Sequence, residues 1–418
     1  MKSFLIFLTI ILSLFKGYSQ DWVERHKFAK SYFGISNFFT PNLPDGNFKN
    51  TNRPLQSFER SGFVTPAINI GATHFWGHAD FYVSISTVDI KLKKNDTKYN
   101  YELGTFTGLR VYPLASKINT VRPYIGYKFS PFTYSQKNTS DQDFRYTKVK
   151  SVFDLGLGIQ LPNLYVTLEY GRVLKTEFNT FLTRSEMSSD RFPVNLLQIG
   201  VNYTIETTGF SDTEVSRNSN KLFSKSNKWG FFFGAGPSAV FPIKSSDYIT
   251  DLYPFLDDKS MPIIFPDIVL GYHYTKLDLI TSLSFRPINQ KRKAYGFEQN
   301  IMRRSVNLEC YKFLGDYHGF APFIGVGTSC EYLTLKETDN GVAITEFSET
   351  IFSPNIVFGW DIRPSEKGDW WILRTNLRYY PVLNLEHRDK TLSLNHLEFN
   401  FIQFVVYPQR IKKMKNAS

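Results

Sequence analysis

The chain has 418 residues, a formal net charge of +11 and an aromatic content of 17%, with 39 Phe and 24 Tyr. Acidic and basic residues are mixed along it, which excludes the continuous basic stripe that nucleic-acid binding requires. The only two cysteines, Cys310 and Cys330, are too few for a disulfide framework, and we expect both to be free thiols. The aromatic content is typical of β-strands and of membrane interfaces.

Residues 1–19 are predicted to be a secretory signal peptide. Lys2 gives a positive start, residues 4–15 are mostly apolar, and Gly17-Tyr18-Ser19 places small residues where a signal peptidase cleaves. The apolar run is too short to cross a membrane as a helix, and no later run is longer. We therefore expect an exported protein whose mature chain begins near Gln20.

Strand-like segments then follow one another, separated by polar segments with turn residues. In the first half we expect strands at 30–40, 62–75, 79–92, 99–114, 121–135, 150–161, 164–174 and 194–205. Short and long connections tend to alternate between them, as in outer-membrane barrels that have short turns on the periplasmic side and long loops outside.

The second half repeats the first. The segment Pro66–Gly71 returns as Pro266–Gly271, an offset of 200 residues, and 32–34 returns as 232–234. Further echoes keep the same order: 80–81 with 278–279, 123–126 with 322–325, and 168–170 with 377–379. Such ordered self-similarity indicates an internal duplication. The predicted domains are a repeat at 20–208, a polar linker rich in Ser and Asn at 209–227, and a repeat at 228–418.

The strands alternate in the manner of membrane-spanning strands. Residues 153–160 place Phe153, Leu155 and Leu157 on one face, opposite Asp154 and small or amide residues. Many of the expected strands are roughly ten residues or longer, which matches a tilted crossing of a bilayer. Aromatic residues gather near strand ends, where an interfacial girdle would lie. A secreted soluble β protein remains an alternative, since a sandwich also alternates.

Short glycine-punctuated strands carry a resemblance to a known group. Pro123-Tyr-Ile-Gly126, Pro322-Phe-Ile-Gly325 and the closing strand Gly200–Tyr203 resemble those of OmpA/OmpX-type small outer-membrane barrels and porin-like relatives. The resemblance implies one eight-stranded unit for each half. The chain departs from the group in one respect, because residues 408–418 follow the terminal aromatic Tyr407.

We therefore expect an all-β protein, a transmembrane antiparallel up-and-down β-barrel of about sixteen strands built from two tandem repeats. The alternative is two separate eight-stranded barrels. We expect it in an outer membrane of the Gram-negative type, with outer-membrane lipid as its partner and no nucleic acid.

Charged residues at inward positions are the candidate site. They would line a pore in a wide barrel, or form a plug of salt bridges in an eight-stranded one, whose interior only holds side chains. The candidates are Asp80, Glu102, Arg110, Arg122, Lys128, Asp154, Glu169, Asp278, Glu309, Arg374 and Arg378.

The predicted function is non-enzymatic: a porin-like channel or passive transporter. One alternative is a structural or adhesive surface barrel without a through-pore. Another is a lipid-modifying barrel enzyme, which would need a Ser and a His within hydrogen-bond reach at the rim. The sequence has no Gly-x-Ser-x-Gly motif and no His/Cys/Asp spacing typical of a metal site, so we predict no catalytic residue, cofactor or metal.

Overall fold

A computed structural model describes residues 30–42, 45–48, 56–58, 61–74, 77–88, 90–94, 97–137, 143–206, 230–256, 263–275, 277–316, 319–363 and 369–415. The predicted signal peptide and the predicted linker both lie outside the described residues. None of the helices in the described ranges has the length and apolar character needed to cross a membrane.

The first half forms a closed antiparallel barrel. Its wall consists, in order, of β1 (Lys30–Asn42), β4 (Ser61–His74), β5 (Ala79–Ser86), β8 (Phe106–Val111), β9 (Thr120–Lys137), β10 (Asp143–Gln160), β11 (Leu164–Val173) and β14 (Asn195–Glu206). The barrel closes where β14 pairs with β1, placing Tyr203 opposite Phe33. Short strands stand beyond one end: β2 (Gly46–Phe48), β3 (Gln56–Phe58), β6 (Ile90–Lys94), β7 (Thr97–Leu103), β12 (Glu177–Phe181) and β13 (Met187–Arg191).

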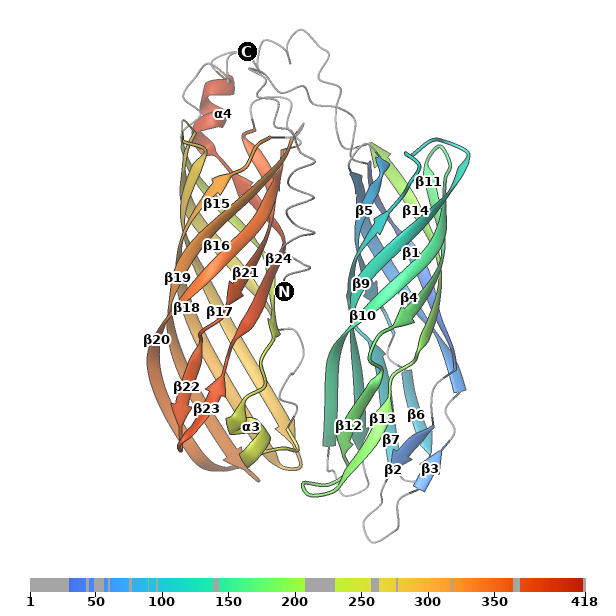
Figure 1. The fold of residues 1–418 in the computed structure, drawn as a ribbon, viewed down its shortest axis with the longest axis vertical. Helices are drawn as coiled ribbons and strands as arrows, with labels where there is room; N and C mark the ends of the chain where they lie inside the picture. The colour runs from blue at the N-terminus through green and yellow to red at the C-terminus, as the bar shows by residue number, and fades with distance from the viewer. Residues whose placement is uncertain are drawn as a thin grey trace, which may run out of the picture.

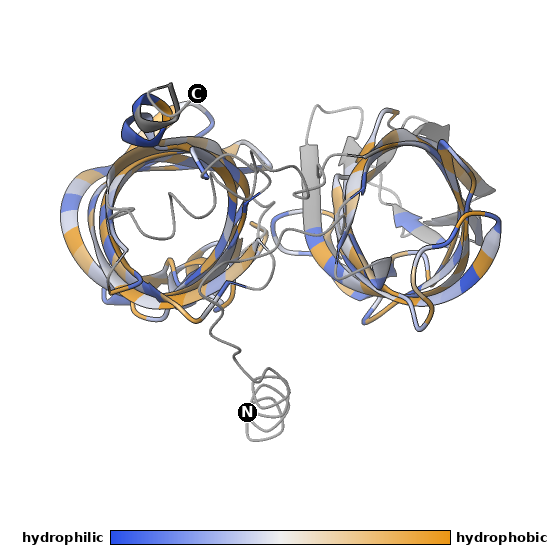
Figure 2. Cartoon of the chain, turned by 90° about the horizontal axis from the view of Figure 1, so that it is seen from above, coloured by the Kyte–Doolittle hydropathy of each residue, from blue (hydrophilic) through white to orange (hydrophobic). Residues whose placement is uncertain are grey.

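The second half closes in the same way. Its wall consists of β15 (Gly230–Pro242), β16 (Ile263–Tyr274), β17 (Leu279–Ala294), β18 (Phe297–Phe313), β19 (Phe320–Asp339), β20 (Val342–Ile362), β21 (Trp371–Tyr380) and β24 (His396–Val406). Its other elements are helix α3 (Asp247–Leu252), the hairpin of β22 (Asn384–His387) and β23 (Lys390–Ser393), and helix α4 (Pro408–Lys415). The two barrels stand side by side (Figure 1) and appear as two separate rings from above (Figure 2).

The single sixteen-stranded barrel, our first expectation, is therefore not the arrangement of this chain, and the alternative of two barrels is. In a lipid environment every strand edge must be paired. The edge of β14 is satisfied by β1 of its own repeat, and the edge of β24 by β15, so neither repeat has a free edge at the level of the wall for the other to join.

Both barrels share one orientation. Each has eight strands, so a chain that enters a barrel at one end also leaves it at that end. The short connections from β4 to β5, from β8 to β9 and from β10 to β11 join strand ends at this end in the first barrel, as do those from β16 to β17, from β18 to β19 and from β20 to β21 in the second. In outer-membrane barrels the short turns lie on the periplasmic side, so the end with the short turns is called the periplasmic end below and the opposite end the outer end.

An apolar band surrounds each barrel. On β20 the outward-facing Phe352, Ile356 and Phe358 are exposed, and on β14 so are Ile199 and Val201. Exposed apolar side chains on every second residue of a closed barrel are those that meet lipid tails. Aromatic pairs such as Phe320–Trp360 and Trp371–Phe404 lie at the periplasmic end of the second barrel, in the position of an interfacial girdle.

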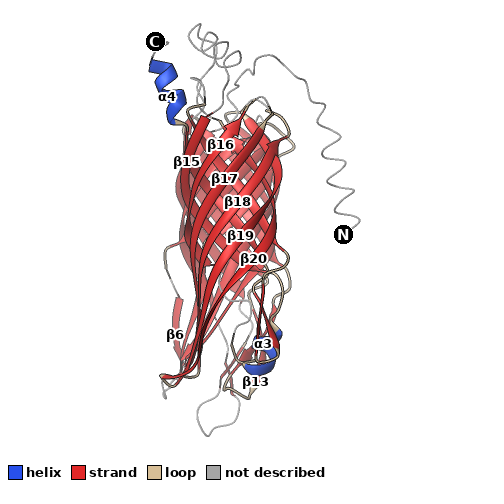
Figure 3. Cartoon of the chain, turned by 90° about the vertical axis from the view of Figure 1, so that its left-hand side faces the viewer, coloured by secondary structure: helices blue, strands red, loops and turns tan. Residues whose placement is uncertain are grey.

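Four strands of the second barrel continue beyond this band (Figure 3). Outward positions of β17 change from Leu283 and Phe285 to Asn289, Lys291 and Lys293. The strands end in tight turns at 295–296 and 340–341, where all four residues have positive φ, as two-residue hairpin turns require. What the sequence suggested as long outer loops is here a projecting four-stranded sheet, β17 to β20, called the extension below.

Candidate functional site: filled interiors and an open sheet edge

A network of ion pairs fills the first barrel. The Glu169 carboxylate accepts a hydrogen bond from Arg110 Nε at 3.0 Å and from the Tyr124 hydroxyl at 2.9 Å, and it also pairs with Lys128. Lys128 Nζ lies 3.0 Å from Asp154 Oδ1. Because these four charged residues are buried and neutralise one another, the middle of the barrel is a structural plug.

The periplasmic half of this barrel is filled by aromatic and charged side chains together. The Tyr112 hydroxyl donates to Asp80 Oδ2 at 2.5 Å. Arg122 Nη1 donates to the Gly77 carbonyl at 2.8 Å, and its guanidinium carbon lies 4.1 Å from the centre of the Tyr112 ring. Such a cation–π contact gives a buried guanidinium a partner without a carboxylate.

Aromatic rings over glycines recur in both barrels. Tyr32 faces Gly71 directly across β1 and β4, and Phe232 faces Gly271 across β15 and β16. A Cβ at Gly71 would lie 2.5 Å from the Tyr32 ring, so only glycine leaves room for it. The same pair at an offset of 200 residues in both positions shows the duplication in three dimensions.

A second network fills the second barrel. Arg378 Nη1 lies 2.9 Å from Asp267 Oδ2 and 2.5 Å from Glu398 Oε1, while Arg378 Nε pairs with Glu309. The other oxygen of Glu398 accepts from Arg286 Nη1 at 2.5 Å. Three carboxylates and two guanidiniums thus share one buried centre.

Two further groups extend this network. Arg286 Nη2 donates to Ser305 Oγ at 2.6 Å, and Ser305 Oγ donates to Glu331 Oε1 at 2.7 Å. Arg374 binds both oxygens of Asp361, at 2.7 and 3.0 Å, in the two-pronged geometry that suits guanidinium and carboxylate. Charged side chains therefore reach from the centre of the second barrel toward its periplasmic end, where Arg374 lies beside Phe232 and Phe323 of a buried apolar cluster.

Nine of the predicted inward residues lie buried inside the barrels: Asp80, Arg110, Arg122, Lys128, Asp154, Glu169, Glu309, Arg374 and Arg378. The side chain of Glu102 lies outside what the structure describes.

Asp278 does not lie in the barrel. It is exposed in the turn before β17, with φ of 51°. The register shows why: Thr73 faces Asp80 in the first barrel, and His273 faces Ile280 in the second, so Ile280 occupies the place of Asp80. The Asp80–Asp278 echo in the sequence was therefore misaligned by two residues.

Other interior charges were missed from the sequence. They are Asp267, Arg286, Arg303, Glu331, Asp361 and Glu398, all buried. Strict alternation could have found several of them: Arg286 follows Ile280, Ser282 and Ser284 on the inward face of β17. Among the described residues no group of His, Cys, Asp and Glu could hold a metal ion, and Cys310 and Cys330 are both free.

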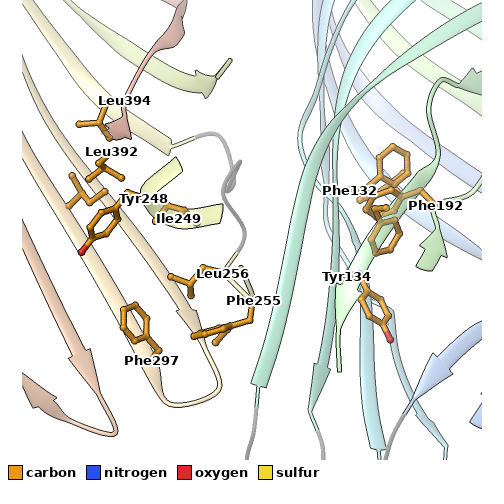
Figure 4. Close-up of a cluster of buried hydrophobic side chains, with 14 of the residues drawn as sticks. Phe132, Tyr134, Phe192, Tyr248, Ile249, Phe255, Leu256, Phe297, Leu392 and Leu394 are labelled. Carbon is orange, nitrogen blue, oxygen red and sulfur yellow. The ribbon is translucent and has the colours of Figure 1, made fainter. Parts of the chain in front are cut away.

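Buried apolar side chains gather toward the outer ends of both barrels. Phe132, Tyr134 and Phe192 form this layer in the first barrel, and Tyr248 and Ile249 of α3 belong to it in the second (Figure 4). These residues lie on both sides of the close-up and belong to one cluster of buried residues.

A buried carboxylate fixes α3 to the extension. The Tyr248 hydroxyl donates to Glu337 Oε2 at 2.9 Å, and Gln299 Nε2 donates to Glu337 Oε1 at 2.8 Å. Burial raises the pKa of Tyr248 above its ordinary value, and the adjacent Glu337 carboxylate raises it further. Tyr248 is therefore a neutral hydroxyl donor at any physiological pH, as this contact requires.

The extension has two edges without a partner strand in the part of the chain that the structure describes. β20 pairs with β21 only from Ile356 onward, and β17 pairs with β16 only up to Phe285. Residues 342–355 and 286–294 are therefore edge strands. Arg388 reaches the β20 edge at Ile344 and Thr345, with Nη2 at 3.4 Å from the carbonyl and 2.6 Å from the hydroxyl.

Comparisons with known proteins bear on the fold only. No protein-family model matches the chain, and no curated protein matches it. Among solved structures it is similar to Ail, the attachment invasion locus protein of Yersinia pestis, at 13% identity and a TM-score of 0.27, covering 43% of this chain and 96% of Ail. It is also similar to OmpT, an outer membrane protein of Vibrio cholerae, at 6% identity and a TM-score of 0.18, covering 92% of this chain and 99% of OmpT. A third similar structure is an outer membrane channel from Pseudomonas putida F1, at 9% identity and a TM-score of 0.22, covering 94% of this chain and 99% of the channel.

The closed barrels and their apolar exteriors define the class of this protein. It is a β-barrel protein of the transmembrane type. In particular, two closed eight-stranded barrels follow one another in a single chain.

Proposed function

We propose that this protein is a non-enzymatic outer-membrane protein without a through-pore, which acts as a structural or adhesive surface protein and binds an extended partner segment along the β20 edge of its extension. Two observations support the proposal: the interiors of both barrels are filled, and one edge of the extension is open. It replaces the porin-like channel that the sequence favoured.

The filled interiors argue against passive transport. An eight-stranded barrel has room only for side chains. Here that room is occupied by ion pairs around Glu169 in the first barrel and around Arg378 in the second. A solute would have to separate buried charges from their partners, and breaking one such pair costs about 3–5 kcal/mol.

The composition of the two open edges distinguishes them. Natural proteins protect edge strands with Lys and Pro. The β17 edge carries Pro287, Lys291 and Lys293, whereas the β20 edge, residues 342–355, contains no Lys and one Pro, Pro354, near its barrel end. β20 carries exposed carboxylates instead, at Glu349 and at Glu346, which pairs with Lys336 on β19. Beyond the Arg388 contact at Ile344 and Thr345, this acidic edge suits an extended segment with basic side chains, which would add a strand to the sheet.

Conductance tests the absence of a pore. The purified full-length protein is reconstituted in a planar bilayer and recorded at both polarities. We expect the baseline of a protein-free bilayer, with heat-modifiable mobility on gels as proof that the barrels are folded. A stable, reproducible single-channel conductance would overturn this part of the proposal.

Strand addition is tested with a library of displayed peptides selected on the full-length protein in nanodiscs. We expect the selected peptides to be extended and basic, and to lose binding to the Glu346→Lys, Glu349→Lys double variant. Glu298→Lys, on β18, which is an inner strand of the same sheet, is the matched control and should keep binding. Equal binding by the edge variant and the control would exclude the β20 edge.

A further inference from the structure

Arg184, at the tip of the β12–β13 hairpin of the first barrel, contacts the second barrel. Arg184 binds both oxygens of Asp339, with Nη1 2.9 Å from Oδ2 and Nη2 2.5 Å from Oδ1. It also donates to the Tyr295 carbonyl, from Nε at 3.0 Å and from Nη2 at 2.6 Å. Tyr295 and Asp339 belong to the two tight turns of the extension, so one guanidinium joins both turns to the first barrel.

The contact is reciprocal. The Tyr295 hydroxyl donates back to the Phe181 carbonyl of the first barrel. The Arg184 guanidinium carbon lies 5.3 Å from the centre of the Phe255 ring, and Phe178, Phe255 and Tyr295 belong to the same buried cluster. Polar contacts at the rim of an apolar core are the usual anatomy of a specific interface.

A second contact lies near the periplasmic end. The rings of Phe81 on β5 and Trp360 on β20 are 6.1 Å apart. Cα atoms of β10 and β17 also approach within 8 Å. The strands of a barrel are tilted against its axis. For this reason β5 and β10 of the first barrel can both face the second barrel, and β20 and β17 of the second can both face the first. The barrels therefore meet at two heights.

We propose that the first barrel is an intramolecular docking partner of the extension: the Arg184 hairpin locks the two barrels into one rigid pair and holds β10 beside the open edge of β17. On the side away from β9, Leu174 N–H donates to the Ser151 carbonyl and the pairing of β10 with β11 begins at Val152, so β10 before Ser151 is not paired with β11. In this arrangement β10 shields the β17 edge, and the β20 edge is left for other molecules.

Pulsed dipolar spectroscopy tests the docking on the full chain in nanodiscs. Cys310 and Cys330 are replaced by Ser, and spin labels are placed at the exposed Met187 and Val342, one on each barrel. We expect a single narrow distance distribution. In Arg184→Ala we expect that narrow peak to be lost, because both turns lose their common partner, while the gel mobility of each folded barrel is unchanged.

Arg191→Ala is the matched control. Arg191 is an exposed arginine of the same hairpin and pairs with Glu177 within it, at 2.9 Å. Arg184→Lys keeps the positive charge but loses the two-pronged hydrogen bonding to Asp339, so it should broaden the distance distribution less than Arg184→Ala does. A broad distribution in the unmodified chain, or the same narrow peak in Arg184→Ala as in Arg191→Ala, would overturn the proposal.

Discussion

Tyr32 lies with its ring against Gly71, its direct partner on the neighbouring strand. Since a Cβ at Gly71 would lie 2.5 Å from ring atoms of Tyr32, Gly71→Ala should destabilise the first barrel by about 1–3 kcal/mol, the usual range for overpacking. Urea unfolding in detergent measures this change. If the ring is the cause, Tyr32→Ala should relieve part of the cost in the double variant; purely additive effects would contradict it.

Arg378 holds three buried carboxylates, so removing its charge should be costly. Arg378→Met leaves Asp267, Glu309 and Glu398 with too few partners, and we expect a loss of about 3–5 kcal/mol in the unfolding free energy. The free energy of unfolding is measured by titration with urea, with the heat-modifiable gel mobility as the signal for the folded barrel. Arg304→Met, an outward-facing arginine on β18, should change it little. Equal effects of both changes would show that the network contributes no more than an exposed arginine.

The docking of the two barrels should weaken at acidic pH. A hydrogen bond from Arg184 and its positive charge lower the pKa of Asp339 below its ordinary value. A lowered pKa means that the docked state binds protons less readily than the undocked one, so docking is fully favoured above the ordinary pKa and weakens as the pH falls through the lowered value. The distance distribution between Met187 and Val342 should therefore stay narrow at neutral pH and broaden in strong acid. In Asp339→Asn, broadening should already be present at neutral pH, and an unchanged distribution there would contradict the assignment.

The Tyr248–Glu337 hydrogen bond should hold α3 in place. Tyr248→Phe keeps the ring but removes the donor, which leaves one oxygen of a buried carboxylate with a poorer set of partners. We expect faster hydrogen exchange in 247–252, with exchange in the wall strands unchanged. Thr250→Val, on the exposed side of the same helix, serves as the comparison. Exchange rates equal in both variants would mean that apolar packing alone fixes α3.

Local patterns in the sequence predicted much of this fold. Alternation and strand length identified most of the wall strands, and the echoes of Gly71 and Gly271 identified the duplication. Closure could not be predicted in the same way, because the strand that pairs with β14 is decided by which distant edge satisfies its backbone groups. Alternation in one strand carries no information on that choice.

The site shows the same division. Inward charges such as Arg110 and Glu169 followed from alternation, whereas their mutual pairing depends on strands far apart in the chain. Asp278 was wrongly predicted to face the barrel interior, because it repeats the residue type of Asp80, whereas the strand pairing places Ile280 at the position that corresponds to Asp80. The extension was also missed, although Asn340-Gly341 between alternating residues is a strong hairpin signal.

The even number of strands in each barrel has a consequence for how such chains can grow. A unit that begins and ends on one side of the membrane can be copied behind itself and still point the same way. A duplicated unit with an odd number of strands would have placed its second copy upside down, with its outer face toward the periplasm. Lys30 and Gly230 begin their barrels at the same end, so lengthening this gene by a whole repeat preserved the polarity of every loop.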